Sequence, residues 1–166
     1  MADSTVTASS SQKHVGRGAT MMRKLTKVHQ SGQRLTVKFD PVTWNVSGAH
    51  ATTFKSYLAY LARSCCSILK HEWKEVDEEE KTKLWTDLES YFDIPVINKE
   101  DRDKDPLRNA WLSYAGDRWR GFKTQLTREY VSRPKEDRKP PYVRYTFIKP
   151  DVWKQFLASR DTPEFK

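Results

Sequence analysis

Apolar residues recur at helical spacing in three stretches of the chain, and these stretches predict its main elements. The first begins at Thr52, where steps of four and three residues define one apolar stripe: Phe54, Leu58, Leu61, Cys65 and Ile68. The second follows Asp77, which stands three residues before Glu80 at the spacing of a capping box, and extends to about Phe92. Its expected buried face consists of Leu84, Trp85, Leu88 and Phe92.

The third stretch is the longest and has the clearest start. Asp105 is a good N-cap residue, and Pro106 suits the first helical turn. The apolar positions then follow each other at steps of three or four: Leu107, Trp111, Ala115, Trp119, Phe122, Leu126 and Tyr130. The pattern predicts one helix over residues 107–131.

Shorter patterns predict the remaining elements. Arg34–Phe39 alternates polar and apolar residues, and Asp40-Pro41 is a turn signal before Trp44–Val46, so we expect a β-hairpin. Tyr142–Phe147 is a candidate short strand. A last short helix should begin at Pro150 and bury its apolar side chains Trp153, Phe156 and Leu157.

The N-terminal residues 1–30 are rich in Ser, Thr and Ala and show no sustained period, so we expect a disordered basic tail. The rest, residues 31–166, is expected to form a single domain. Its fold class is mainly α: a three-helix bundle with a short N-terminal β-hairpin and a C-terminal helix. Trp73, Trp85 and Trp119 stand at the buried faces or edges of this bundle, which is how Myb-like and trihelix DNA-binding domains build a small core.

Charge narrows the possible partners. The chain has 166 residues and a net charge of +8. The middle third is acidic and both flanks are basic, which favours polyanionic partners.

No apolar run is long enough for a membrane span or a secretory signal. Cys65 and Cys66 are neighbours and cannot join distant segments, which excludes a disulfide-stabilised scaffold.

Catalytic patterns are weak. The four histidines have no Cys or carboxylate at metal-ligand spacing, and Cys65 lies on an apolar stripe where a thiol is normally inert. The glycines of a phosphate-binding loop are missing, since Gly16 and Gly18 fall in the tail. We therefore expect a protein that is not an enzyme and that has no metal, cofactor or small-molecule substrate.

The outward face of the long helix carries the candidate chemistry. At 100° per residue, Arg120, Thr124, Thr127 and Arg128 lie away from the apolar stripe, with Lys123 at its flank. The segment from Arg118 to Arg144 has nine basic and three acidic residues. Guanidinium and hydroxyl groups on an exposed helix suit phosphate and groove recognition. The candidate DNA contacts are Arg118, Arg120, Lys123, Thr124, Thr127, Arg128, Arg133, Lys135, Arg138 and Lys139.

Two other interpretations of this face stay open. The charged residues can form a simple solvated helix face. They can also give solubility to a protein-interaction module that binds a second copy or another transcription regulator.

Several segments in a shared order resemble the plant CACTA-type transposase family, also called Ptta/En/Spm. The most specific are LWTDLESYFDI, DRWRGFKTQLTREYV and the C-terminal WKQFLASRDTPEF. The resemblance covers nearly the whole chain after Gly18. It implies a transposase-derived, double-stranded DNA-binding protein without the nuclease, located in the nucleus, that acts as a transcriptional regulator or binds transposon ends.

Overall fold

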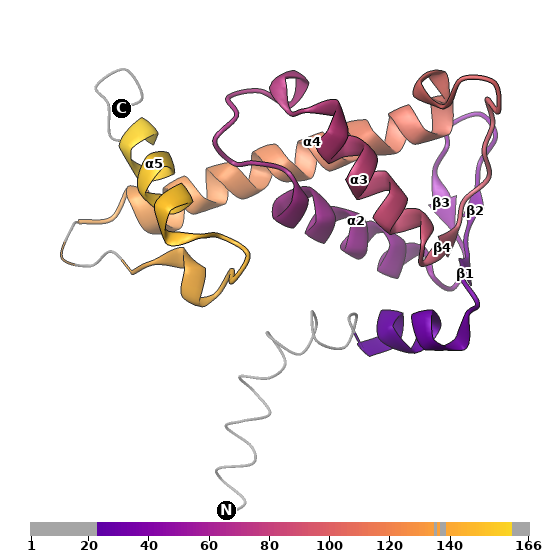
Figure 1. Ribbon diagram of the computed structural model, residues 1–166, viewed down its shortest axis with the longest axis horizontal. Helices are drawn as coiled ribbons and strands as arrows, with labels where there is room; N and C mark the ends of the chain where they lie inside the picture. Colours follow the sequence, from indigo (N-terminus) through magenta and orange to yellow (C-terminus); the bar gives the residue numbers. More distant parts are fainter. Residues whose placement is uncertain (1–22, 135, 137–138, 161–166) are drawn as a thin grey trace, which may run out of the picture. The chain divides into compact units, whose positions relative to one another are not determined.

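The computed structural model describes residues 23–134, 136 and 139–160, and this part of the chain is mainly helical (Figure 1). The α-helices are α2 (Ala51–Cys65), α3 (Glu78–Glu89), α4 (Pro106–Leu126) and α5 (Pro150–Arg160). The strands are β1 (Leu35–Thr36), β2 (Lys38–Phe39), β3 (Val46–Ser47) and β4 (Phe92–Asp93). Short helical turns are η1 (Trp73–Glu75), η2 (Arg102–Lys104), the π-helical η3 (Thr127–Val131) and η5 (Pro141–Val143).

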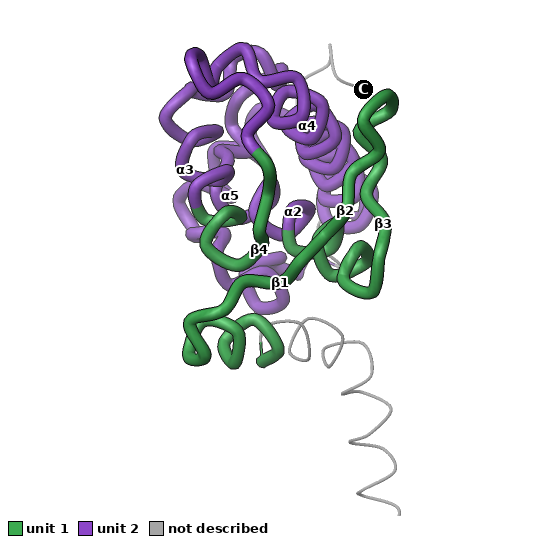
Figure 2. Tube along the Cα trace, turned by 90° about the vertical axis from the view of Figure 1, so that its right-hand side faces the viewer, with its two compact units in different colours: residues 1–57, 87–95 green, residues 58–86, 96–166 purple. Residues whose placement is uncertain are grey.

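The chain forms two compact units, whereas the sequence predicted one domain over residues 31–166 (Figure 2). Unit 1 comprises residues up to Tyr57 together with residues 87–95. Unit 2 comprises residues 58–86 and the chain from Val96 onward. The unit boundaries fall inside α2 and α3, so each of these helices contributes residues to both units.

Unit 1 contains the expected hairpin and one pairing that the sequence did not indicate. Strand β2 pairs antiparallel with β3, and the turn between them is held by the Asp40 carboxylate, which accepts from the backbone N–H groups of Val42 (2.8 Å) and Thr43 (2.9 Å). Strand β1 pairs in parallel with β4, which aligns Leu35 with Phe92. Unit 1 therefore joins segments from both sides of α2.

Phe54 lies at the centre of unit 1. Its ring meets Phe39 edge-on at 5.5 Å between centroids and Phe92 at 5.3 Å. Phe92 is buried, as predicted, but it lies in β4 and not in a helix. The helix α3 ends at Glu89 because the chain turns there, with the Tyr91 N–H bonded to the Leu88 carbonyl and the Tyr91 carbonyl accepting from Leu35.

Helical structure begins before the tail boundary that composition predicts. Residues 23–31 are helical, and Leu25 in this helix is only 1% exposed. Gly32 follows with φ of 74°, the left-handed conformation that commonly ends a helix. One buried leucine is too little apolar content to be recognised from composition. The rest of the expected tail, residues 1–22, lies outside the described residues.

Unit 2 is organised around α4, whose predicted start is confirmed. The buried Asp105 carboxylate accepts from the N–H groups of Leu107 (3.0 Å) and Arg108 (3.1 Å) at the helix N-terminus. Its second oxygen accepts from Ile97 (2.7 Å) and Asn98 (3.1 Å) in the preceding loop. Every member of the predicted apolar stripe from Leu107 to Leu126 is buried, and Tyr130 is half-buried.

The second half of α4 packs against the C-terminal segment. The cluster contains Ile68, Phe122, Leu126, Val131, Tyr145, Ile148, Trp153 and Phe156. Helix α5 begins at Pro150 as predicted. The strand expected over residues 142–147 is wrong, because Pro141–Val143 form the 3-10 turn η5. Pro140 and Pro141 have no N–H for a strand ladder, and a proline favours the first position of a helical turn.

One core assignment shifts by a residue. Cys66 is buried and Cys65 is only half-buried, the reverse of the expectation that Cys65 lies in the core. Helix α2 ends at Cys65, so the helical stripe no longer determines which side chain points inward beyond it. Burial raises the pKa of the Cys66 thiol to about 12, which leaves it protonated and unreactive at neutral pH.

Candidate nucleic-acid interface

A basic cavity of about 370 Å³ lies in unit 2, beside the outward face of α4. Its walls come from α4, from η3, from the loop that follows α2 and from the last residue of α5. The lining residues are His71, Arg120, Lys123, Thr124, Thr127, Arg128, Ser132 and Arg160. Four of these residues are Lys or Arg, and none of them is acidic. The cavity brings together five residues that the sequence predicted as DNA contacts.

The side chains predicted on the outward face of the long helix are mostly exposed. Arg120, Thr124 and Arg128 are exposed, and Thr127 is half-buried. The Thr124 hydroxyl donates to the Arg120 carbonyl (3.1 Å) and the Thr127 hydroxyl to the Lys123 carbonyl (2.9 Å). The hydroxyl protons are therefore engaged with the helix backbone, so the guanidinium groups of this face are its principal donors to an anion.

The π-helical turn η3 shapes one wall of the cavity. The Ser132 N–H donates to the carbonyl of Thr127, five residues earlier, at 2.9 Å. This wider turn changes the directions of the side chains relative to a continued α-helix, and it contributes Thr127 and Arg128 to the lining. Such π-turns are rare and occur frequently at functional sites.

Lys123 is the main correction to the predicted face. Its side chain was expected at an exposed flank, but the residue is only 5% exposed. The ammonium donates to the backbone carbonyls of Lys70 and His71 and lies 4.2 Å from the centre of the Trp119 ring. Burial, with a contribution from the positive charge of Arg160, lowers the pKa of Lys123 to about 8. Lys123 therefore fastens the loop after α2 to α4, and the residue also lines the cavity.

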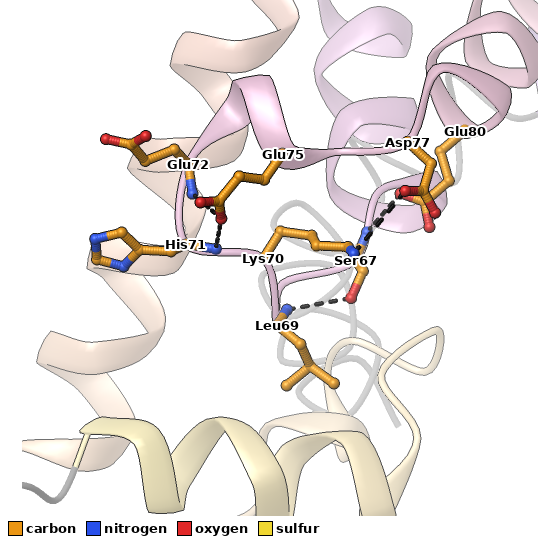
Figure 3. A network of polar contacts seen from close by, with 8 residues as sticks. All are labelled: Ser67, Leu69, Lys70, His71, Glu72, Glu75, Asp77 and Glu80. Atoms are coloured by element: carbon orange, nitrogen blue, oxygen red, sulfur yellow. Dashed lines mark hydrogen bonds and ion pairs between the residues drawn. The ribbon is translucent and has the colours of Figure 1, made fainter.

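A network of polar contacts holds that loop in place (Figure 3). The Glu75 carboxylate accepts from the backbone N–H groups of His71 (3.1 Å) and Glu72 (3.3 Å). The Ser67 N–H donates to the Glu80 carboxylate at 3.3 Å, which engages Glu80 outside its expected role in a capping box. The His71 imidazole points away from the Glu75 carboxylate in Figure 3 and lines the cavity.

No protein-family model, curated protein or solved structure matches this chain. The interpretation of the cavity therefore depends on the chemistry of its own residues. Within the described residues, no group of three His, Cys, Asp or Glu side chains could hold a metal ion. In the same part of the chain, no helix has the length and apolar character needed to cross a membrane.

The other predicted contacts that the structure describes lie outside the cavity lining. Arg118 is exposed and covers the Tyr114 ring, with its Nε donating to the Tyr114 hydroxyl at 3.2 Å. Arg133 and Lys139 are exposed in the segment after η3. Lys135 and Arg138 lie outside the described residues. The described candidate contacts thus lie in two places, the cavity lining and the exposed positions beside it.

Three cavity residues were missed by the sequence analysis: His71, Ser132 and Arg160. Arg160 closes the basic last turn of α5, and its guanidinium lies 4.9 Å from the centre of the Phe156 ring. Burial lowers the pKa of Arg160. The position of Arg160 at the basic end of an amphipathic helix was visible in the sequence and could have indicated a candidate contact. No local pattern connects His71 with α4, because the loop that carries it is placed by contacts more than fifty residues apart in sequence.

Proposed function

We propose that this protein binds double-stranded DNA through the outward face of α4 and the basic segment at residues 132–144. In this proposal it has no nuclease activity and acts in the nucleus as a transcriptional regulator or as a factor that binds transposon ends. The resemblance to the CACTA-type transposase family supplies the biological context, and the charge of the α4 face supplies the physical support.

The observation that carries the proposal is the lining beside α4, which is rich in cations and has no carboxylate among the residues that the structure describes. Arg120 on α4 and Arg128 on η3 are both exposed, and both line the cavity. A guanidinium can donate two parallel hydrogen bonds to one phosphate, and each neutralised phosphate releases counterions. Arg120 also forms an ion pair with Asp117, but both side chains are more than half exposed, so this pair is weak and can be exchanged for phosphate.

The fold that we propose for this function is a Myb-like or trihelix-like bundle of α2, α3 and α4. Trp85 on α3 and Trp119 on α4 are both buried, which supports their assignment to the scaffold and not to the DNA-contacting surface. The Trp119 indole N–H donates to the Ser67 carbonyl at 3.2 Å. This bond orients the apolar stripe of α4 inward and so leaves the opposite face available to a phosphate backbone.

Two triple variants with equal charge change test the proposal. The first neutralises three exposed arginines of the proposed interface: Arg120→Gln, Arg128→Gln and Arg133→Gln. The matched control neutralises three exposed lysines elsewhere: Lys55→Gln, Lys83→Gln and Lys99→Gln. Binding to a fluorescent duplex is measured by anisotropy from 50 to 200 mM salt, after both variants are shown to melt like the parent.

We expect the interface triple to weaken binding strongly and to flatten the slope of log affinity against log salt by up to roughly 0.9 for each phosphate that the variant no longer neutralises. The control triple should have little effect. Equal weakening by both triples would indicate attraction by net charge alone. Unchanged binding in both would contradict the proposed interface and favour a protein-interaction module.

A further inference from the structure

The cavity has features that a purely external DNA-binding face does not require. Arg160 and His71 belong to its lining, yet they come from α5 and from the loop after α2. Both lie outside the α4 face and the basic segment proposed to meet DNA. The cavity thus brings side chains from three separate parts of unit 2 to one volume, and its positive charges come from α4, η3 and α5.

The like charges in this cavity repel each other. Arg160 lies close enough to Lys123 to contribute to the low pKa of its ammonium, and Lys123 is held in place by two backbone carbonyls. Glu75 acts on Lys123 in the opposite sense, but its carboxylate is occupied by the N–H groups of His71 and Glu72. A bound anion would relieve this repulsion.

We propose that the cavity binds a free small molecule that carries two or more phosphate groups. The guanidinium groups of Arg120, Arg128 and Arg160 donate to the phosphate oxygens, and Lys123 adds a fourth positive charge to the lining. Arginine is suited to this because its planar fork matches the geometry of phosphate.

The size of the cavity distinguishes a small molecule from a single backbone phosphate. Its volume of about 370 Å³ falls within the range of about 300–1,000 Å³ typical of small-molecule sites. It has room for more than one phosphate group, and its cations come from α4, η3 and α5. Arg120 and Arg128 belong both to this cavity and to the proposed DNA interface. The ligand should therefore compete with DNA, and only this competition rests on the proposed function.

Titration calorimetry with inorganic pyrophosphate as the probe tests the proposal. Citrate at equal ionic strength is the comparison, because it carries several carboxylates and no phosphate. Inorganic phosphate is the single-group comparison. We expect saturable one-to-one binding of pyrophosphate that is at least about tenfold tighter than that of either comparison anion. Equal affinity for pyrophosphate and citrate, or no pyrophosphate binding, would overturn the proposal.

Single substitutions locate the site. Arg160→Gln should weaken pyrophosphate binding at least about tenfold, since it removes charge-assisted hydrogen bonds. Arg133→Gln is the matched control, because Arg133 is exposed and absent from the cavity lining. It should change the affinity less than twofold. Arg128→Gln is a second cavity variant. Because Arg128 is exposed, its substitution does not remove a packing contact such as that of Arg160 on Phe156, which could affect folding. Equal effects of Arg133→Gln and both cavity variants would exclude the cavity as the site.

Binding measurements with duplex DNA distinguish a site for a phosphorylated small molecule from a site for the DNA backbone. Arg160→Gln should leave the affinity for DNA within about threefold of the parent while the affinity for pyrophosphate falls at least about tenfold. In the parent, pyrophosphate should displace DNA with a midpoint that follows its calorimetric affinity. If the parent binds pyrophosphate but no DNA, the proposed function fails and the ligand site stands. If Arg160→Gln weakens DNA binding and leaves pyrophosphate binding unchanged, the cavity is part of the DNA interface and the ligand proposal is wrong.

Discussion

Gly116 and Gly121 lie on the same helix, α4, but in opposite environments, and they provide the sharpest test of the packing in unit 2. A Cβ added at Gly116 would lie 2.7 Å from two ring atoms of Trp73 and 2.9 Å from a third. A Cβ added at Gly121 would meet no atom within 4 Å. The same substitution, glycine to alanine, should therefore have opposite effects at the two positions.

The magnitudes follow from helix propensity and from overpacking. In a helix interior, alanine is favoured over glycine by about 0.8–1 kcal/mol. At Gly116 this gain is opposed by an overpacking cost of about 1–3 kcal/mol. The Trp73 ring is not free to move away, because it packs on Trp119 at 5.5 Å between centroids and lies under the Lys81 ammonium at 5.1 Å. We expect Gly121→Ala to stabilise the protein by about 1 kcal/mol and Gly116→Ala to destabilise it by about 1 kcal/mol.

Thermal unfolding followed by circular dichroism measures this difference of about 2 kcal/mol, which corresponds to roughly 4–8 °C in Tm for a chain of this size. The mechanism is checked in the background of Trp73→Ala, where the clash is removed. There Gly116→Ala should become stabilising. If Gly116→Ala raises Tm as much as Gly121→Ala in the parent, the placement of Trp73 against α4 is wrong.

Three further predictions concern the cap, the N-terminal helix and a titrating lysine. Asp105→Ala should destabilise the protein by about 2–4 kcal/mol in urea unfolding, because four backbone N–H groups lose their acceptor; a decrease below about 0.5 kcal/mol would contradict its capping role. Leu25→Ala should lower the free energy of unfolding by about 2–5 kcal/mol. An unchanged midpoint of urea unfolding would contradict the packing of the N-terminal helix and favour a tail that does not contribute to folding. The pKa of Lys123 is about 8 in the folded protein and about 10.4 in an unfolded chain, so the unfolded state binds more protons between these values. The stability of the parent relative to Lys123→Met should therefore rise by about 1–3 kcal/mol between pH 8 and pH 10, and a flat or falling difference would contradict the burial of a charged Lys123.

The sequence predicted the elements that local chemistry determines. Asp105 and the stripe from Leu107 to Leu126 define α4, because capping and helical spacing depend only on nearby residues. The end of α3 at Glu89 was not predicted, since Phe92 continues the apolar spacing although the chain has already turned. The sequence also did not indicate the pairing of β1 with β4. Strands of two residues carry no alternation that could indicate a partner.

The same distinction applies to the candidate site. The exposure of Arg120 and Thr124 on α4 follows from the angle per residue along one helix, whereas the position of Arg128 also depends on the π-helical turn η3. The burial of Lys123 does not, because it requires the loop after α2 to cover that part of α4. Arg160 could be placed at a helix end from the sequence, but its position beside the cavity depends on the packing of the C-terminal cluster.

The pairing of β1 with β4 also determines the order in which the nascent chain can fold. Residues up to Tyr57 leave the ribosome long before Phe92, the partner of Leu35 in the parallel ladder. Until then Phe54 lacks one of the two aromatic rings that surround it. Closing so long a loop is entropically costly and slow compared with forming a helix. A fragment truncated after Glu89 would keep the helical part of α3 and still leave unit 1 without its last strand, so a fragment that is to contain unit 1 must extend at least to Pro95.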